Sequence, residues 1–280
     1  MLALAVAAGA CVTTTNYLDP SGPKYAGDYA TRSKAAWRLR PDGPVRVVTF
    51  NIAYGTRIDR ALEVLGEAEP LRDFDALALQ EMDARGADRM ARELGLHYVY
   101  FPGGIHPDKQ RDFGCAILSP WPLERPYKVV LPHEAFGSGL RRAAIVATVV
   151  RGGDRFRFYS VHLPAPLAVS MASRREQAQV LIADAEAAPE PVIIAGDFNS
   201  YGIGEEFAKA GFTWITSDTE PTVQPVFLGF RLDHIFAKGL AEASLSAEAG
   251  VVQDNRGASN HKPVWAAIEF GASNGLKGFD

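Results

Sequence analysis

A carboxylate and an amide stand two residues apart at Asp197 and Asn199, directly after the apolar run Val192–Ala195. The apolar run predicts a strand that is covered on both faces, and Gly196 lets the backbone turn as it leaves the sheet. Residues two apart in an extended chain point to the same side, so both side chains can address one point. That point could hold a cation or a phosphate group, although a strand that simply ends in an Asp/Asn turn explains the same residues.

Five further apolar runs begin or end with residues of the same chemical kinds. These residues are Asn51, Gln80 with Glu81, His162, Asp233 with His234, and Asn260 with His261. A small number of hard oxygen ligands suits Mg²⁺ or Mn²⁺, which take one or two protein carboxylates and leave the other positions to water or phosphate oxygens. The set therefore predicts a site for Mg²⁺ or Mn²⁺. His234 is predicted to be structural, because strand alternation turns it away from the side that Asp233 faces.

The composition fits one large globular domain, since the chain has 280 residues and is 47% hydrophobic. Its formal net charge of −4 gives no overall positive field that would attract nucleic acid or an anionic membrane. A phosphate would therefore have to meet bound cations or local guanidinium groups such as Arg141 and Arg142, unless these two residues form only a solvated strand start. The two cysteines, Cys11 and Cys115, exclude a disulfide framework and a zinc site, and Cys115 is predicted to be a small core residue.

The N-terminus differs in character from the rest of the chain. Residues 1–11 are apolar and end in small residues before Cys11, as in a secretory signal with a lipoprotein processing site. Ala8 departs from the Leu that is usual there, and no Lys or Arg precedes the run, so a disordered apolar extension is the alternative. On the export hypothesis the protein is periplasmic or anchored to a membrane through Cys11, and otherwise it is cytoplasmic. Residues 12–43 are then a tether, and residues 272–280 a tail.

The remaining residues, 44–271, predict a single domain of strands and covering helices. Strands are expected within 45–55, 74–82, 97–103, 114–123, 142–150, 155–163, 191–197, 230–239 and 261–270, and helices within 57–69, 87–95 and 173–187. We expect two packed sheets with helices outside them. The stretch 119–127 is either an exposed aromatic segment or, as we favour, a Trp-Pro turn packed on the core. No aromatic hairpin suited to insertion into lipid is evident.

The motifs TFNIAYG, LALQEMD, YSVHLP, IIAGDFNS, RLDHIF and SNHKPVW occur in this order and span nearly all of residues 45–270. This ordered series resembles the endonuclease/exonuclease/phosphatase superfamily, which includes deoxyribonuclease-like nucleases, abasic-site endonucleases, sphingomyelinases and inositol-polyphosphate phosphatases. The resemblance implies an α/β fold, a four-layer sandwich of two mixed sheets flanked by helices. It also implies hydrolysis of phosphate esters with a divalent cation, usually Mg²⁺.

The resemblance implies a role for each residue that matches a motif. Glu81 would be the principal metal ligand, with Asn51 beside it. Asp197 would orient or deprotonate the attacking water, and Asn199 would bind the phosphate. His261 would be the final catalytic histidine, with Asp233 as its partner carboxylate.

Three further roles follow from the resemblance. His162 would be a second histidine facing the phosphate, and Arg142 could add a guanidinium to it. The family usually reads Ser-Asp-His where this chain has Ser259, Asn260 and His261. Asn260 could still coordinate a metal through its carbonyl oxygen, but the lost charge favours a single cation or weaker metal affinity. Either Asp197 or the His261 pair could take the proton of the water.

The predicted function is divalent-metal-dependent hydrolysis of a phosphodiester by in-line attack of water, with a nuclease as the first hypothesis. A sphingomyelinase-like lipid phosphodiesterase or a phosphatase is the alternative, so the predicted partner is DNA, RNA or a phospholipid head group. A non-catalytic binding module at the cell envelope is a third reading, which the complete residue set disfavours. The protein is expected to be a monomer.

Overall fold

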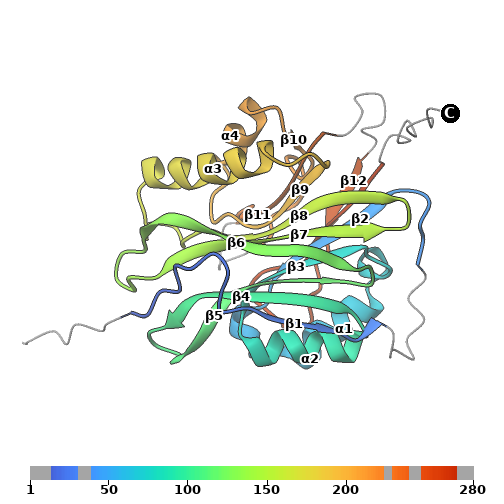
Figure 1. Cartoon of the computed structure of the whole chain (residues 1–280), viewed down its shortest axis with the longest axis horizontal. Helices are drawn as coiled ribbons and strands as arrows, with labels where there is room; N and C mark the ends of the chain where they lie inside the picture. Colours follow the sequence, from blue (N-terminus) through green and yellow to red (C-terminus); the bar gives the residue numbers. More distant parts are fainter. Residues whose placement is uncertain (1–13, 31–38, 224–228, 240–246, 270–280) are drawn as a thin grey trace, which may run out of the picture.

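A computed structural model describes residues 14–30, 39–223, 229–239 and 247–269 (Figure 1). The strands are β1 Tyr25–Asp28, β2 Val45–Asn51, β3 Ala76–Met82, β4 His97–His106, β5 Arg111–Ser119, β6 Leu123–Glu134, β7 Arg141–Arg151, β8 Asp154–His162, β9 Val192–Asp197, β10 Thr213–Trp214, β11 Asp233–Lys238, β12 Ala247–Val251 and β13 Val264–Ile268. The α-helices are α1 Ile58–Glu67, α2 Ala84–Leu94, α3 Met171–Glu186 and α4 Gly204–Lys209, and short 3₁₀ turns lie at Ala53–Gly55 and Glu69–Leu71.

The strands form two mixed sheets with the same arrangement at their centres. The seven-stranded sheet has the order β1-β4-β5-β3-β2-β13-β12, and the six-stranded sheet has the order β10-β11-β9-β8-β7-β6. In the first, β2 and β3 are parallel, and in the second, β8 and β9 are parallel. Antiparallel strands flank each parallel pair. The carboxyl ends of a parallel pair lie at one edge of its sheet, and the candidate site residues Asn51, His162 and Asp197 lie at these ends.

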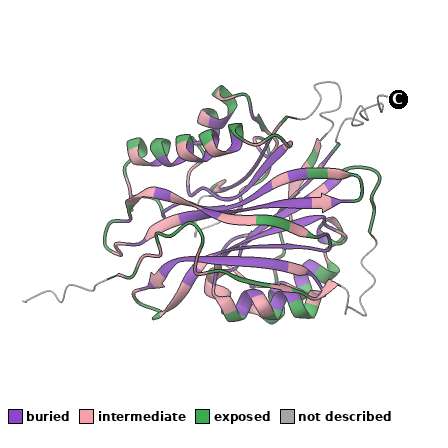
Figure 2. Ribbon diagram, viewed as in Figure 1, coloured by how far each residue is buried: buried purple, intermediate pink, exposed green. Residues whose placement is uncertain are grey.

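Helices cover the outer face of each sheet, so the molecule has four layers (Figure 1). One apolar core lies between the two sheets, a second packs α1 and α2 against the seven-stranded sheet, and a third packs α3 and α4 against the six-stranded sheet. Figure 2 shows the central strands buried along most of their length, with exposed residues mainly on helices and turns. The predicted four-layer α/β sandwich is confirmed, and it leaves only the strand ends free for chemistry.

Gly196 is required by a close approach between strands and not by the turn that the sequence predicted. It lies inside β9, paired in parallel register with Val161 of β8. A Cβ atom at this position would be 2.0 Å from the carbonyl oxygen of Val161. Only glycine fits this contact, which sets the spacing of the two strands that carry His162 and Asp197.

Replacing Gly196 by alanine is expected to lower the free energy of unfolding by about 3 kcal/mol, the upper end for overpacking, because backbone must move to admit the methyl group. Urea denaturation measures the change. Gly202→Ala is the matched control, since a Cβ there meets nothing within 4 Å. A loss at Gly196 no larger than at Gly202 would show that β8 and β9 separate without cost.

Part of the segment predicted as a tether belongs to the folded domain. Strand β1 lies within residues 12–43 and pairs with β4 from Tyr25 opposite Tyr100 to Asp28 opposite His97. Asn16 also forms a bridge with Gly104. The prediction was wrong for these residues because β4 leaves an open sheet edge, which a short segment of low apolar content can cover through backbone hydrogen bonds.

Strand β6 was also missed, because charged residues and prolines interrupt its apolar pattern. Trp121, just before it, is buried and its Nε1 donates to Asp75 at 2.6 Å, which confirms the predicted packing of this turn on the core. Cys115 is buried as predicted.

The predicted signal segment with Cys11 and the predicted tail lie outside the described residues. Among the helices that the structure describes, none has the length and apolar content needed to cross a bilayer.

Candidate active site

The predicted site residues meet where the two parallel strand pairs end. Asn51 closes β2 opposite Gln80 of β3, and His162 closes β8 opposite Asp197 of β9. Asp233 opens β11 directly opposite Asp197, because β11 runs antiparallel to β9. His261 precedes β13, which runs antiparallel to β2 in the other sheet. The topology therefore brings residues from both sheets to one edge of the sandwich.

Glu81 reaches this edge through an irregularity in β3. The pairing of β3 with β5 shifts register between Leu79 and Met82, and Glu81 has a φ of 57°. A non-glycine residue in this left-handed region is strained, and a bulge of this kind re-aims a side chain. Its neighbour Gln80 points elsewhere, bonding Thr49 and Ser160 in the buried space between the sheets. The bulge thus separates a structural residue from a candidate metal ligand.

Asp197 lies at the centre of the cluster. Its Oδ2 accepts hydrogen bonds from Nδ2 of Asn51 at 3.0 Å and Nδ2 of Asn199 at 3.1 Å. The Nε2 atoms of His162 and His261 lie 3.6 and 3.7 Å from the same oxygen. Burial raises the pKa of Asp197, and the charge on His261 opposes that increase. A carboxylate so placed can hold or accept a proton at its Oδ2.

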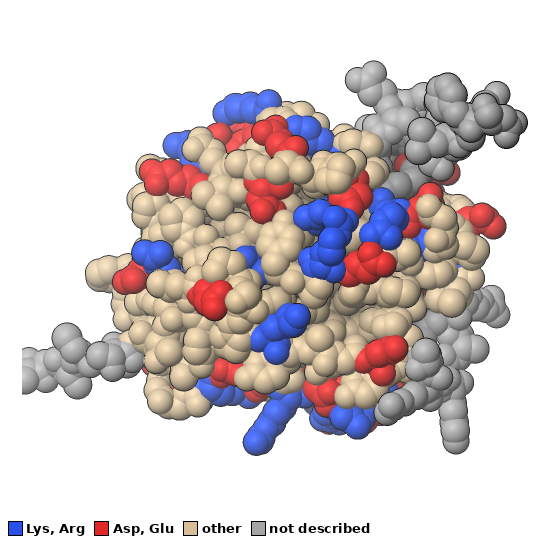
Figure 3. All heavy atoms as spheres, in the orientation of Figure 1, with Lys and Arg blue, Asp and Glu red and all other residues tan. Residues whose placement is uncertain are grey.

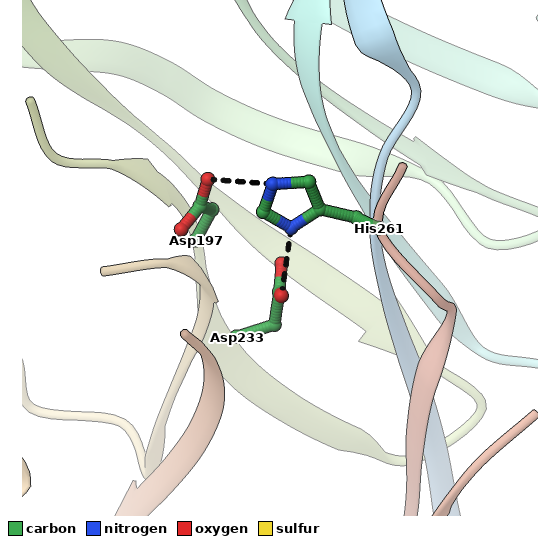
Figure 4. Close-up of side chains that lie close together, drawn as sticks. All are labelled: Asp197, Asp233 and His261. Carbon is green, nitrogen blue, oxygen red and sulfur yellow. Dashed lines mark hydrogen bonds and ion pairs between the residues drawn. The ribbon is translucent and has the colours of Figure 1, made fainter. Parts of the chain in front are cut away.

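His261 lies between two carboxylates (Figure 4). Its Nδ1 is 2.9 Å from Oδ2 of Asp233, and its Nε2 faces Asp197. Burial alone lowers the pKa of His261, but Asp233 and Asp197 outweigh it, so the pKa is raised. With a carboxylate beside each ring nitrogen, the imidazole is held as a cation that donates from Nδ1 to Asp233 and directs Nε2–H toward Asp197.

His162 is held in the opposite protonation state. Its Nδ1 lies 3.5 Å from Nη1 of Arg142, whose guanidinium also stacks over the Phe113 ring at 4.7 Å. Because a guanidinium only donates, Nδ1 must accept and Nε2 carries the proton, directed at Asp197 and at Oε1 of Glu81 3.9 Å away. Burial, followed by the charge of Arg142, holds the pKa of His162 well below its ordinary value. Arg142 therefore orients His162, while its predicted contact with phosphate stays a prediction.

The two asparagines present their amide nitrogens to the carboxylates. Asn51 donates from Nδ2 to Glu81 at 3.2 Å as well as to Asp197, and its Oδ1 accepts from the backbone of Ala53. Asn199 donates from Nδ2 to the carbonyl of Leu163 as well as to Asp197. In this arrangement Asn51 positions two carboxylates, where the sequence predicted a metal ligand. Its oxygen is occupied by a backbone donor.

The other predicted residues lie further from this cluster. Asn260, a predicted metal ligand, is exposed, and its Oδ1 is 3.5 Å from Oγ of Ser259, so no described contact joins it to the carboxylates. Arg141 pairs with Glu134 at 3.8 Å. His234 bonds Trp214 and the carbonyl of Ser200 on the other side of β11, in agreement with the structural role predicted for it.

Arg174 is a residue that the sequence reasoning missed. This buried guanidinium on α3 donates to the carbonyls of Pro164 at 2.8 Å and Phe198 at 3.0 Å, and so ties the loop after His162 to the residue before Asn199. Arg174 shares a helical face with Ala178 and Leu181, at positions i, i+4 and i+7. A lone arginine on the apolar face of a helix was the signal that could have identified it.

The donor set fits a hard divalent cation. Asp197, Asp233 and His261 offer atoms that lie within 4.8 Å of one another, and Oδ1 of Asp233 is buried with no hydrogen-bond partner among the described residues. Both nitrogens of His261 face carboxylates, however, so its ring offers no free lone pair to a metal. The oxygen-rich side, where Glu81 and Asp197 share the Asn51 amide, suits Mg²⁺ or Mn²⁺ better.

A family comparison agrees with this geometry. Residues 48–261 match the model of the Endonuclease/Exonuclease/phosphatase family, and this range holds every residue of the cluster. The chain belongs to the endonuclease/exonuclease/phosphatase family. Members of this family are phosphoesterase hydrolases that generally depend on a divalent metal, and this chain is accordingly a phosphoesterase. No curated protein matches the chain.

Solved structures of other family members share the fold at low sequence identity. An endonuclease/exonuclease/phosphatase from Bacteroides vulgatus is 16% identical, with a TM-score of 0.65, and covers 82% of this chain and 100% of its own. A mannosyl-6-phosphatase from Bacteroides thetaiotaomicron is 18% identical, with a TM-score of 0.63 and coverage of 81% and 100%. TDP2 from D. rerio, complexed with a single-strand DNA product, is 16% identical, with a TM-score of 0.61 and the same coverage.

Proposed function

We propose that this protein hydrolyses phosphodiesters with a divalent cation, Mg²⁺ or Mn²⁺, by in-line attack of water on phosphorus. One observation carries the proposal: Glu81 and Asp197, from different sheets, share the amide of Asn51, while two imidazole Nε2 atoms lie 3.6 and 3.7 Å from Asp197. Such a cluster offers cation ligands, a proton acceptor and proton donors at one strand edge.

In this mechanism Glu81 would hold the cation. When bound, the cation supplies a Lewis acid that offsets negative charge on the phosphoryl oxygens. Asp197 orients the attacking water and receives its proton, because its buried carboxylate is the acceptor at the centre of the cluster. His261 is unsuited to accept that proton, because two carboxylates hold it as a cation, with Nδ1 donating to Asp233 at 2.9 Å and Nε2 facing Asp197 at 3.7 Å.

The two histidines serve the phosphate in different ways. His261, held as a cation by Asp233, stabilises charge that develops on the phosphoryl oxygens. His162 is neutral and donates from Nε2, as Arg142 fixes its tautomer. Asn199, anchored to Leu163 and Asp197, is proposed to contact the phosphate from just beyond the end of β9.

A nuclease is the first candidate, and the fold shared with TDP2, which is complexed with a DNA product, supports it. A phospholipid phosphodiesterase is the second, because a groove of about 540 Å³ runs from Asn199 and Arg174 to the exposed Phe136 and Leu167. Basic and acidic residues are interspersed on the face shown in Figure 3, with no continuous basic stripe there to follow a nucleic-acid backbone.

We also propose that the protein is exported and lipid-anchored at Cys11.

Removal of the metal is expected to abolish hydrolysis. Treatment with EDTA should reduce the release of p-nitrophenol from bis-p-nitrophenyl phosphate by a factor of about a hundred or more, because water and phosphate lose the Lewis acid. Addition of Mg²⁺ or Mn²⁺ should restore it. Faster cleavage of the monoester p-nitrophenyl phosphate than of the diester would contradict the diester proposal, and full activity in EDTA would contradict the metal.

A substrate panel then separates the two candidates. Plasmid DNA, single-stranded DNA, RNA and sphingomyelin vesicles are offered to the same preparation with Mg²⁺. Cleavage of a nucleic acid alone supports the nuclease, and release of a phosphorylated head group alone supports the lipid phosphodiesterase. Since both are phosphodiesters, activity on neither would contradict both candidates.

A further inference from the structure

Three apolar side chains stand exposed beside the active site. Phe136, Leu167 and Met171, which we name the apolar rim, are 88%, 95% and 45% exposed. Phe136 lies in the turn between β6 and β7, and Leu167 and Met171 lie in and just after the loop between β8 and α3. Large apolar side chains this exposed at neighbouring loops indicate a surface that is covered by a partner.

The two loops of the apolar rim are fixed to each other and to the active site. The backbone N–H of Phe136 donates to the carbonyl of Ala168 at 2.7 Å. All three rim residues line a groove of about 540 Å³ that Arg174 and Asn199 also line. The fold therefore fixes the position of the apolar rim, and the groove joins the rim to the catalytic cluster at Asn199.

The described chain begins at Thr14, on the same side of the domain as the apolar rim. Thr14 Oγ1 donates to the carbonyl of Ser138, and Asn16 Nδ2 donates to that of Gly139 at 2.9 Å, in the turn that carries Phe136. Figure 1 shows this blue segment and the β6–β7 turn together at the left of the molecule. Cys11 precedes Thr14 by three residues, so the chain cannot carry the two Cα atoms more than about 11 Å apart.

The charged residues next to the apolar rim have partners on the protein. Glu134, two residues before Phe136, faces Arg141 at 3.8 Å. Glu176 on α3 forms a hydrogen bond with the imidazole of His133 at 2.6 Å. Because these charged groups already have partners, the protruding apolar side chains suit an electrically neutral, apolar partner better than a strongly anionic one.

We propose that the apolar rim docks the protein on a phospholipid bilayer, with Phe136 and Leu167 inserted among the lipids beside Thr14, where the described chain begins. Two observations favour a bilayer over a nucleic acid or a second copy of this chain. The rim comprises three side chains on two adjoining segments, whereas a subunit interface covers about 800 Å² per partner and a single-strand site combines aromatic rings with a positively charged groove. The described chain begins at Thr14, which contacts the turn that carries Phe136, and Cys11 lies three residues before Thr14 in the sequence. The proposal holds whichever ester is cleaved, because it concerns binding and not hydrolysis.

A flotation assay with phosphatidylcholine vesicles tests the proposal. Full-length chains carrying Cys11→Ser, which cannot be acylated, are compared with and without Phe136→Ser and Leu167→Ser together. Partition into the vesicles is expected to fall at least about tenfold in the double variant, because two apolar side chains no longer enter the lipid. Leu39→Ser with Tyr25→Ser, two exposed apolar residues outside the rim, should leave it unchanged. Circular dichroism confirms that each variant is folded.

A second measurement locates the contact. Fluorescence of the tryptophan introduced by Phe136→Trp, after subtraction of the native signal, should be quenched by brominated phosphatidylcholine, and that introduced by Leu39→Trp should not. Vesicle binding that is unchanged in the double variant would overturn the proposal, since other parts of the chain would then make the contact. Quenching of Phe136→Trp by single-stranded DNA but not by lipid, or loss of a dimer in the double variant, would overturn it in favour of those partners.

Discussion

The Asp197→Asn variant is expected to remain folded and to lose phosphodiesterase activity by about a thousandfold, the range seen when a positioned proton acceptor is removed. The amide is isosteric, but it cannot receive the proton of the water, and its NH₂ group would face donors. Asp197 Oδ2 now accepts from Asn51 and Asn199 and lies near the Nε2 atoms of two histidines. Initial rates on bis-p-nitrophenyl phosphate at saturating Mg²⁺ measure the loss.

Thermal unfolding separates chemistry from folding in this experiment. If Asp197→Asn unfolds below the assay temperature, the rate loss carries no information on the proton acceptor. In that case Asp233→Asn serves, because Asp233 bonds His261 and lies opposite Asp197 in the strand register. Loss of that carboxylate should weaken the imidazolium and lower kcat, with a smaller effect on KM. A folded Asp197→Asn enzyme with more than a tenth of the native rate would contradict the assigned role.

The Glu81→Gln variant is expected to lose activity by a similar factor, about a hundredfold to a thousandfold, because the amide retains one oxygen but removes the negative charge that a hard cation requires. Glu81 is the only predicted metal ligand that the β3 bulge re-aims, and its carboxylate accepts from Asn51 at 3.2 Å. Part of the activity should return at high Mg²⁺ concentration, since the defect is one of affinity. Rates measured against Mg²⁺ concentration give the apparent constant.

Glu93→Gln is the matched control for this prediction. Glu93 is exposed on α2, and the same change of charge there should alter the rate less than twofold. An equal response to Mg²⁺ in Glu81→Gln, Glu93→Gln and the native protein would contradict the role of Glu81 as a ligand.

The location of the site could be predicted from the sequence because it depends on topology. Apolar runs such as Val192–Ala195 mark strands that are buried on both faces, and the next polar residue marks the strand end. Because the parallel pairs β2–β3 and β8–β9 end at one edge, residues as distant as Asn51 and Asp197 were expected to meet, and their side chains are 3.0 Å apart.

The finer geometry could not be predicted, because it depends on contacts between distant residues. The φ of 57° at Glu81 follows from a register shift against β5, which no local pattern encodes. The Asn51 amide faces inward because the N–H of Ala53 occupies its oxygen. Gly196 looked like a turn residue, whereas the carbonyl of Val161 explains it.

The exposed apolar residues of the surface could not be predicted from the sequence either. The exposure of Phe136 follows from the position of the β6–β7 turn in the fold. Strand β6 itself was missed, because Pro126 and Pro132 interrupt its pattern. Whether a side chain is exposed depends on how the whole molecule packs. The sequence of a short segment such as 135–140 is therefore the same whether its side chains are buried or exposed.

The central claim, that Glu81 holds the divalent cation of the site, is tested most directly by a titration with Mn²⁺ in which electron paramagnetic resonance reports the free ion. The native protein should bind Mn²⁺ with an affinity that Glu81→Gln weakens at least about tenfold, while Glu93→Gln leaves it unchanged. Equal Mn²⁺ affinity in the native protein and in a folded Glu81→Gln variant would contradict the account.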